Sequence, residues 1–136
     1  MSADDHGRRL LPAGEGELIL LVEDDEAWRE ANAEVLRALG YRVLEAENAE
    51  EAWEQWERHG EEIALVLTDL MLPGVSDAYL CSALNGQDSV PVIVISGHPI
   101  DAEDDRLAGV THRLQKPFRI ERLARVIYDT LGTARS

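Results

Sequence analysis

Cysteine is nearly absent from this sequence, and histidine is sparse and dispersed. Cys81 is the only cysteine, and the four histidines are His6, His59, His98 and His112. A single thiol excludes a framework of disulfides, and the histidine spacing does not match that of a zinc site. A bound divalent cation therefore has to be a hard ion held by oxygen atoms.

Long apolar stretches are lacking as well. No run in the chain approaches the roughly 20 apolar residues that are needed to span a bilayer. The charged first residues are followed only by Leu10 and Leu11 before Pro12, so the apolar stretch of a secretory signal is missing. We therefore expect a cytoplasmic protein that does not enter a membrane.

Positive charge is scarce compared with negative charge. The chain has 13 Lys and Arg against 27 Asp and Glu, which gives a net charge of −14. Such a protein repels the phosphate backbone of nucleic acids, which argues against DNA or RNA binding. Lys116 is the one lysine among the 13 basic residues, so its identity needs an explanation.

The length and composition predict one folded domain. The chain has 136 residues, 45% of them hydrophobic and 29% charged, which is typical of a soluble globular protein. Residues 1–17 are rich in Gly, Pro and charge, and we expect a flexible lead-in there. The domain is expected over residues 18–131, with a short tail at 132–136.

Apolar runs of strand length alternate with segments of helical period along this domain. Strands are expected at residues 18–22, 41–46, 63–67, 90–95 and 110–114. Helices are expected at residues 27–39, from 49 onward, at 77–84, at 102–107 and at 120–131. This alternation predicts right-handed crossovers and a parallel sheet covered on both faces.

The apolar content of the strands predicts their order. The first, third and fourth runs are continuously apolar, as buried central strands are, whereas Arg42, Glu45, His112 and Arg113 interrupt the second and fifth. This pattern favours a flavodoxin-like (βα)5 doubly wound parallel sheet with strand order 2-1-3-4-5. The switch point of that order lies between strands one and three, so a ligand is expected at their carboxyl ends.

Carboxylates follow both of these strands. Glu23, Asp24 and Asp25 come after the first strand, and Asp69 comes after the third. Taken alone, the first group is more typical of a helix cap, and Asp69 is as typical of an ordinary turn. Two carboxylates about 4 Å apart repel by about 4 kcal/mol at an effective dielectric constant near 20. A cluster of three therefore needs a cation, and Mg²⁺ suits it.

Two further polar residues are expected at the same edge of the sheet. Ser96 ends the fourth strand and Lys116 follows the fifth. A carboxylate can act as a nucleophile toward a phosphoryl group, whose oxygens then need positive charge and hydrogen-bond donors. Lys116 can supply a compact ammonium and Ser96 a hydroxyl, although Ser96 with Gly97 alone is more typical of a plain turn.

Four segments together resemble the receiver domain of bacterial response regulators. The resemblance spans about residues 18–131, and the segments are Leu21-Val22-Glu23-Asp24-Asp25, Thr68-Asp69-Leu70-Met71-Leu72-Pro73-Gly74, Ile95-Ser96-Gly97 and Gln115-Lys116-Pro117-Phe118. It implies that Asp69 takes a phosphoryl group from the phosphohistidine of a histidine kinase. It also implies that Mg²⁺ is held by Glu23, Asp24, Asp69 and the backbone carbonyl of Met71.

The resemblance assigns Ser96 and Lys116 to contacts with the phosphoryl group and predicts a cis bond between Lys116 and Pro117. Receivers usually carry an aromatic residue three positions before this lysine, where the chain has Arg113. Either Arg113 packs outward and the signal travels differently, or the domain passes phosphoryl groups on without a large conformational change. Trp28 is expected to pack in the core, near enough to the metal to report binding.

Several functions are compatible with these residues. The main hypothesis is a monomer or weak homodimer that is phosphorylated by a histidine kinase or histidine phosphotransfer protein and acts through an unknown downstream partner. Such a domain catalyses only its own phosphorylation and dephosphorylation. A second hypothesis is the receiver of a hybrid histidine kinase, which passes phosphoryl groups to a histidine phosphotransfer protein; the start at Met1 argues mildly against it.

Two other families fit less well. A Mg²⁺-dependent phosphatase of the haloacid dehalogenase type needs a second aspartate two residues after the nucleophile, where this chain has Met71. A flavodoxin has a Ser-, Thr- and Gly-rich phosphate loop after its first strand, whereas the residues here are acidic.

Overall fold

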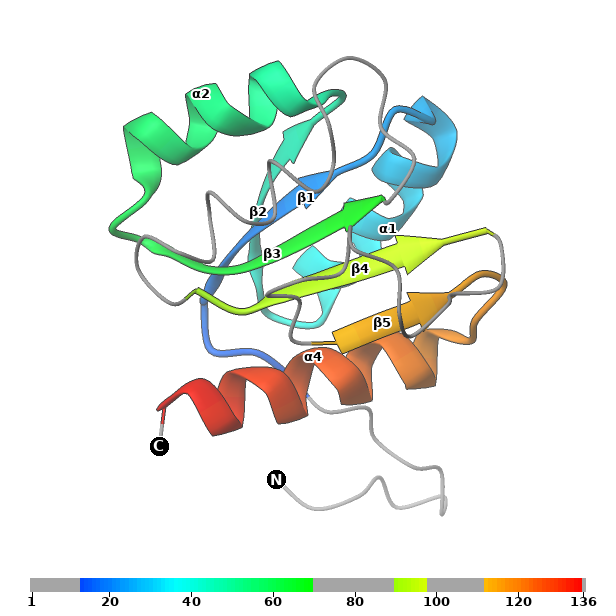
Figure 1. The fold of residues 1–136 in the computed structure, drawn as a ribbon. Coiled ribbons are helices and arrows are strands. Elements are labelled where there is room, and N and C mark those ends of the chain that lie inside the picture. The colour runs from blue at the N-terminus through cyan, green and yellow to red at the C-terminus, as the bar shows by residue number, and fades with distance from the viewer. Residues whose placement is uncertain (1–12, 70–89, 98–111, 136) are drawn as a thin grey trace.

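Five parallel strands form one sheet in the order β2-β1-β3-β4-β5 (Figure 1). The structure is a computed structural model and describes residues 13–69, 90–97 and 112–135. The strands are β1 (Leu18–Val22), β2 (Arg42–Ala46), β3 (Ile63–Asp69), β4 (Val92–Ser96) and β5 (His112–Gln115). This order confirms the predicted flavodoxin-like doubly wound sheet.

Burial explains why the apolar runs predicted the strand order. Every residue of β1 and β4 is buried, and in β3 only Ala64 is partly exposed. In the edge strand β2, by contrast, Arg42 is exposed and Glu45 is half-buried. Central strands have both faces covered and therefore read as continuous apolar runs.

Three described helices cover the sheet: α1 (Glu26–Ala38), α2 (Ala49–His59) and α4 (Ile120–Arg135). Side chains of α1 and α4 share one core with one set of strand side chains, and side chains of α2 share another with the alternate set. The two cores therefore lie on opposite faces, because successive residues of a strand point to opposite sides. The helices expected at 77–84 and 102–107 lie outside the described residues.

Local signals at the helix ends agree with the sequence. The Asn48 side chain caps α2 by accepting a hydrogen bond of 2.8 Å from the backbone N–H of Glu51. Gly40 follows α1 with a φ of +100°, a conformation that costs glycine little and other residues more. Among the described helices, none combines the length and apolar character that crossing a membrane requires.

Both ends of the domain differ from the sequence-based boundaries. The backbone N–H of Gly14 donates to the Leu39 carbonyl at 2.7 Å, and that of Arg42 donates to the Glu17 carbonyl at 2.9 Å. Residues 14–17 are thus tied to the start of β2. At the other end, α4 continues to Arg135 instead of giving way to a tail at 132. A single glycine at 132 costs a helix only about 1 kcal/mol, which does not end it.

Candidate functional site

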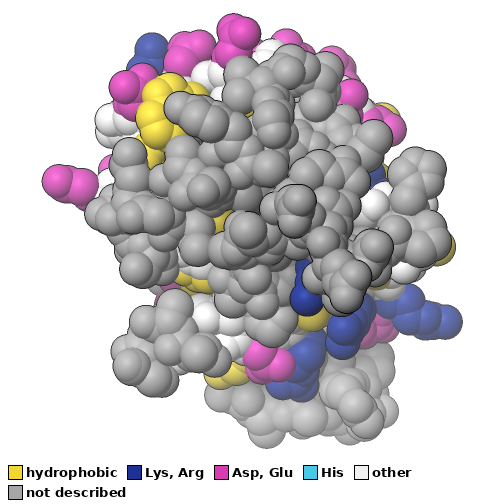
Figure 2. Space-filling view, in the orientation of Figure 1, with side chains coloured by type: hydrophobic (Ala, Val, Ile, Leu, Met, Phe, Trp, Pro, Cys, Tyr) yellow, Lys and Arg dark blue, Asp and Glu magenta, His cyan; other side chains and the backbone are white. Residues whose placement is uncertain are grey.

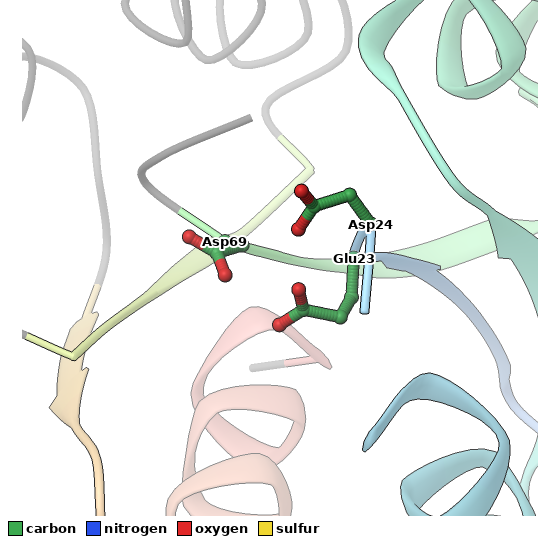
Figure 3. A group of neighbouring side chains, drawn as sticks. All are labelled: Glu23, Asp24 and Asp69. Carbon is green, nitrogen blue, oxygen red and sulfur yellow. The ribbon is translucent and has the colours of Figure 1, made fainter. Parts of the chain in front are cut away.

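Three carboxylates meet at the carboxyl ends of β1 and β3. Glu23 and Asp24 extend from the end of β1 toward Asp69, the last residue of β3 (Figure 3). Each side chain offers an oxygen, and these oxygens lie within 4.8 Å of one another. Glu23 and Asp69 are buried, with 1% and 8% of their surface exposed, whereas Asp24 is exposed. Two carboxylates of the cluster are therefore buried, and the third is accessible to solvent.

Asp25, the third member of the acidic run, has a different role. Its side chain caps α1 by accepting a hydrogen bond of 3.1 Å from the backbone N–H of Trp28. Its own backbone N–H donates to a Glu23 carboxylate oxygen at 3.0 Å. The two interpretations of this run, helix cap and ligand cluster, thus apply to neighbouring residues.

Lys116 brings an ammonium group to the carboxylates. Its Nζ lies 2.9 Å from Glu23 Oε1 and 3.4 Å from Asp69 Oδ2. The Lys116 backbone N–H donates to the Ser96 carbonyl at 2.7 Å, and the bond between Lys116 and Pro117 is cis, as predicted. One ammonium cannot balance three ionised carboxylates, so the site keeps an excess of negative charge.

The pKa values of Glu23 and Lys116 are both raised at this site. Burial raises the pKa of Glu23 from its ordinary value of 4.5 to about 7, and the nearby Asp69 and Asp24 carboxyl groups add to the rise. Hydrogen bonds from Lys116 and from the Asp25 backbone oppose it. Burial lowers the pKa of Lys116, but its hydrogen bond to Glu23 and the charges of Glu23 and Asp69 outweigh burial and raise it overall.

The donor atoms fit a hard divalent cation. Mg²⁺ binds carboxylate oxygens and keeps several waters, so a half-open cluster of three carboxylates suits it. A cation at this point also stabilises the ionised form of Glu23, which burial disfavours. Met71, whose backbone carbonyl the family resemblance implies as a ligand, lies outside the described residues.

Ser96 is buried at the end of β4, with 1% of its surface exposed. It pairs in register with Gln115 of β5, the residue before Lys116, while Asp69 pairs with Ile95, the residue before Ser96. The sheet therefore brings the ends of β3, β4 and β5 together. Gly97 follows Ser96 and is exposed, and among the described residues no atom lies within 4 Å of where its side chain would begin.

Trp28 and Phe118 also lie at the site. The sequence predicted Trp28 near the metal, but it did not predict the contact of Trp28 with Lys116 or the place of Phe118. The Trp28 ring centroid lies 4.4 Å from Lys116 Nζ, and the Trp28 and Phe118 rings meet edge to face with centroids 6.1 Å apart. Trp28 is partly exposed and packs at the border of the core rather than inside it. Its place on the first turn of α1, near the acidic run, was the available signal.

Arg29 is a second residue that sequence reasoning missed. Its guanidinium donates to the Glu23 backbone carbonyl at 2.9 Å and forms an ion pair with Glu45 of β2 at 3.3 Å. Only 11% of the Arg29 side chain is exposed. Arg29 therefore connects the backbone at Glu23 with the neighbouring edge strand β2.

Arg113 packs outward: it is exposed, while the next residue, Leu114, is buried. Together with Arg119 and Arg122, it lines an open hollow beside β5 and the start of α4. Figure 2 shows Lys and Arg side chains gathered in this region of the viewed face. Of the first sequence-based alternative, the structure thus shows the outward side chain, and the different route of the signal stays a prediction.

Comparison with known proteins decides the family. The model of the response regulator receiver domain matches residues 19–128. The chain belongs to this family. It is thus a receiver domain of the kind used in two-component signalling, and the fold and the order of its motifs agree with that membership.

Relatives and solved structures support the assignment. The sensory transduction protein RegX3 of Mycolicibacterium smegmatis is 37% identical over 92 residues, which cover 68% of this chain and 39% of RegX3. The receiver thus spans well under half the length of this curated relative. The solved receiver domain of the hybrid histidine kinase CckA is 36% identical, with a TM-score of 0.72 and coverage of 84% of this chain and 98% of that one.

A third comparison concerns the fold alone. The response regulator protein TrrA of Thermotoga maritima was solved in complex with Mg²⁺-BeF and is 23% identical to this receiver. Its TM-score is 0.77, and the match covers 84% of this chain and 98% of TrrA.

Proposed function

We propose that this receiver accepts a phosphoryl group on Asp69 from the phosphohistidine of a histidine kinase or histidine phosphotransfer protein, with Mg²⁺ beside the carboxylate. The observation that carries the proposal is the position of Asp69 between two kinds of group. It shares a cluster of oxygens with Glu23 and Asp24, and the Lys116 ammonium lies 3.4 Å from its Oδ2.

The reaction is a transfer between two groups. An Asp69 oxygen attacks the phosphorus of the donor, the phosphorus–nitrogen bond breaks, and the histidine nitrogen leaves with the bonding electrons. Lys116 donates to one phosphoryl oxygen and the Ser96 hydroxyl to another, which stabilises charge that is spread over these oxygens. Both residues are held at the strand ends by the register of β3, β4 and β5.

Glu23, Asp24, Asp69 and the Met71 carbonyl would hold the metal ion. Mg²⁺, when bound, supplies positive charge to the carboxylates and to the phosphoryl oxygens. The excess of carboxylates over ammonium groups at the site supports this assignment. So does the TrrA complex, which holds Mg²⁺-BeF in the same fold.

The phosphorylated domain acts by binding a downstream protein, and its chemistry is limited to its own phosphorylation and dephosphorylation. The cytoplasmic location and the monomeric or weakly dimeric state stay predictions of the sequence. The match to the CckA receiver favours a second candidate, a receiver that passes phosphoryl groups to a histidine phosphotransfer protein. Rapid loss of the phosphoryl group to such a protein, measured with labelled phosphate, distinguishes this candidate from a receiver that retains it.

Incubation with acetyl phosphate and Mg²⁺, followed by intact-mass measurement, tests the central proposal. We expect the wild type to gain one phosphoryl group, and Asp69→Asn to gain none. Asp129→Asn is the matched control, because Asp129 lies exposed on α4, where it forms a surface ion pair with Arg125. Equal phosphorylation of the wild type and Asp69→Asn would remove Asp69 from its role.

A further inference from the structure

The Lys116 ammonium contacts two carboxylates and an aromatic ring. Its ammonium lies 2.9 Å from a Glu23 oxygen and 3.4 Å from an Asp69 oxygen, and it lies 4.4 Å from the centroid of the Trp28 ring. The face of an indole ring is negative and attracts an ammonium at this distance. Trp28 thus adds attraction without adding another titratable group.

Trp28 is itself held from two directions. Its backbone N–H is bound by the Asp25 side chain at the start of α1, which fixes where the side chain leaves the helix. Its ring meets the edge of Phe118 at an interplanar angle of 88°. Phe118 lies two residues after Lys116, so the ring contacts both the lysine and the segment that carries it.

The Lys116 side chain is more exposed than its carboxylate partners, so contact with the Trp28 ring can restrict its conformations. The Lys116 side chain is 24% exposed, whereas its partners Glu23 and Asp69 are 2% and 11% exposed at their side chains. A flexible lysine side chain with this access to water can adopt several rotamers, and restricting it to one costs conformational entropy. A ring in contact with the ammonium narrows these positions and replaces part of its water.

We propose that Trp28 is a positioning residue, which holds the Lys116 ammonium against its ring and within reach of Asp69, and so prepares the lysine to meet the incoming phosphoryl group. This inference rests on the proposed function of Asp69. The chain offers a direct probe, because Lys116 is the only lysine in the sequence.

Selective labelling with ¹³C-lysine therefore gives signals from Lys116 alone. Protons above the face of an indole ring are shifted upfield, so we expect the Lys116 Cε protons of the wild type to lie upfield of those in a short peptide. Trp28→Leu should abolish this shift, and Trp28→Phe should keep part of it. Lys116 protons that already match the peptide in the folded wild type would overturn the inference.

A second measurement tests whether the contact between Trp28 and Lys116 affects the rate of phosphorylation. Trp28→Leu should slow phosphorylation by acetyl phosphate about three- to tenfold, the range expected when an ammonium loses one partly desolvated ring contact. Trp28→Phe should recover most of the rate. Trp53→Leu is the matched control, because Trp53 packs on α2 against the opposite core and should leave the rate unchanged.

These outcomes separate the two proposals. If the wild type takes up no phosphoryl group, the function of Asp69 is overturned while the lysine shift still tests the contact. If phosphorylation proceeds at the same rate in Trp28→Leu and the wild type, positioning by Trp28 is overturned and Asp69 keeps its role. Melting temperatures of all variants are measured alongside, and Trp28→Phe decides the matter if Trp28→Leu does not fold.

Discussion

Lys116 and Glu23 are 93 positions apart in the chain, and their charged atoms lie 2.9 Å apart. Glu23 is almost fully buried at the end of a central strand, and Lys116 follows an edge strand on the far side of β3 and β4. The contact therefore depends on the complete sheet. It also leaves a buried carboxyl group whose charge is only partly compensated, which has measurable consequences.

Glu23 should make the metal-free protein less stable as the pH rises. Its folded pKa of about 7 exceeds the ordinary value of 4.5, so the native state binds its proton more tightly than the unfolded state. The contribution of Glu23 to the free energy of unfolding is therefore full below pH 4.5 and is lost as the pH rises to about 7. The loss amounts to about 3 kcal/mol.

Urea unfolding between pH 4 and 8, in the presence of a chelator, measures this effect. In Glu23→Gln the part of the pH dependence that belongs to Glu23 should disappear. Glu30→Gln, an exposed residue of α1, serves as the control and should follow the wild type. Parallel pH profiles for the wild type and Glu23→Gln would contradict the raised pKa.

Mg²⁺ should stabilise the folded protein. A ligand that binds only the native state raises the free energy of unfolding by about 2.7 kcal/mol when its concentration is a hundred times its dissociation constant. Thermal melts with and without Mg²⁺ at pH 7.5 measure the gain. An unchanged melting temperature across a Mg²⁺ titration would argue strongly against the metal site.

Removing one carboxylate should have opposite effects in the two buffers. In metal-free buffer, Asp69→Ala should raise the free energy of unfolding by roughly 1 kcal/mol, because it relieves repulsion from Glu23 and Asp24. With Mg²⁺ present the order should reverse, since the variant has lost a ligand. Urea unfolding in both buffers gives the comparison, and a variant less stable than the wild type in both would contradict it.

Arg29→Ala should destabilise the protein by about 2 kcal/mol, because loss of this nearly buried guanidinium takes a donor from the Glu23 carbonyl and leaves Glu45 with its exposed partner Arg37. Arg125→Ala is the matched control. Its ion pair with Asp129 is exposed and 3.8 Å long, so its loss should cost less than about 0.5 kcal/mol. Equal losses in urea unfolding would mean that Arg29 does not anchor the loop.

Two glycines should respond to alanine in opposite directions. Gly132→Ala should stabilise the protein by roughly 0.5–1 kcal/mol, because the residue is exposed within α4 and its Cβ would meet no atom of the described residues within 4 Å. Gly40→Ala should destabilise it, because φ is +100° there and the Cβ would lie 2.6 Å from the Gly14 carbonyl oxygen. Thermal melts of both variants give the signs directly.

The strand order of the sheet was predictable because the amino-acid composition of each strand reflects how deeply it is buried. Continuous apolar residues in β1, β3 and β4 indicate burial on both faces, and charged residues in β2 and β5 indicate edges. The end of α4 was less predictable. Residues after Leu131 lack an apolar stripe, yet the helix continues because its earlier turns already hold it against the core.

The site was predictable only in part. The parallel topology placed Glu23, Asp24, Asp69, Ser96 and Lys116 at one edge of the sheet, as their positions after strands indicated. Their partners were not predictable, because contacts such as those of Arg29 and Trp28 depend on side-chain directions rather than on spacing along the chain.

The two ends of the described chain lie away from the carboxylates. Residues 14–17 are bound where α1 ends and β2 begins, and α4 runs back from the end of β5 toward the amino-terminal edge of the sheet (Figure 1). A fluorescent protein or an effector module could therefore be fused through a linker beyond either described end without being placed beside the three carboxylates. The receiver is, for this reason, a suitable part for engineered phosphorylation sensors.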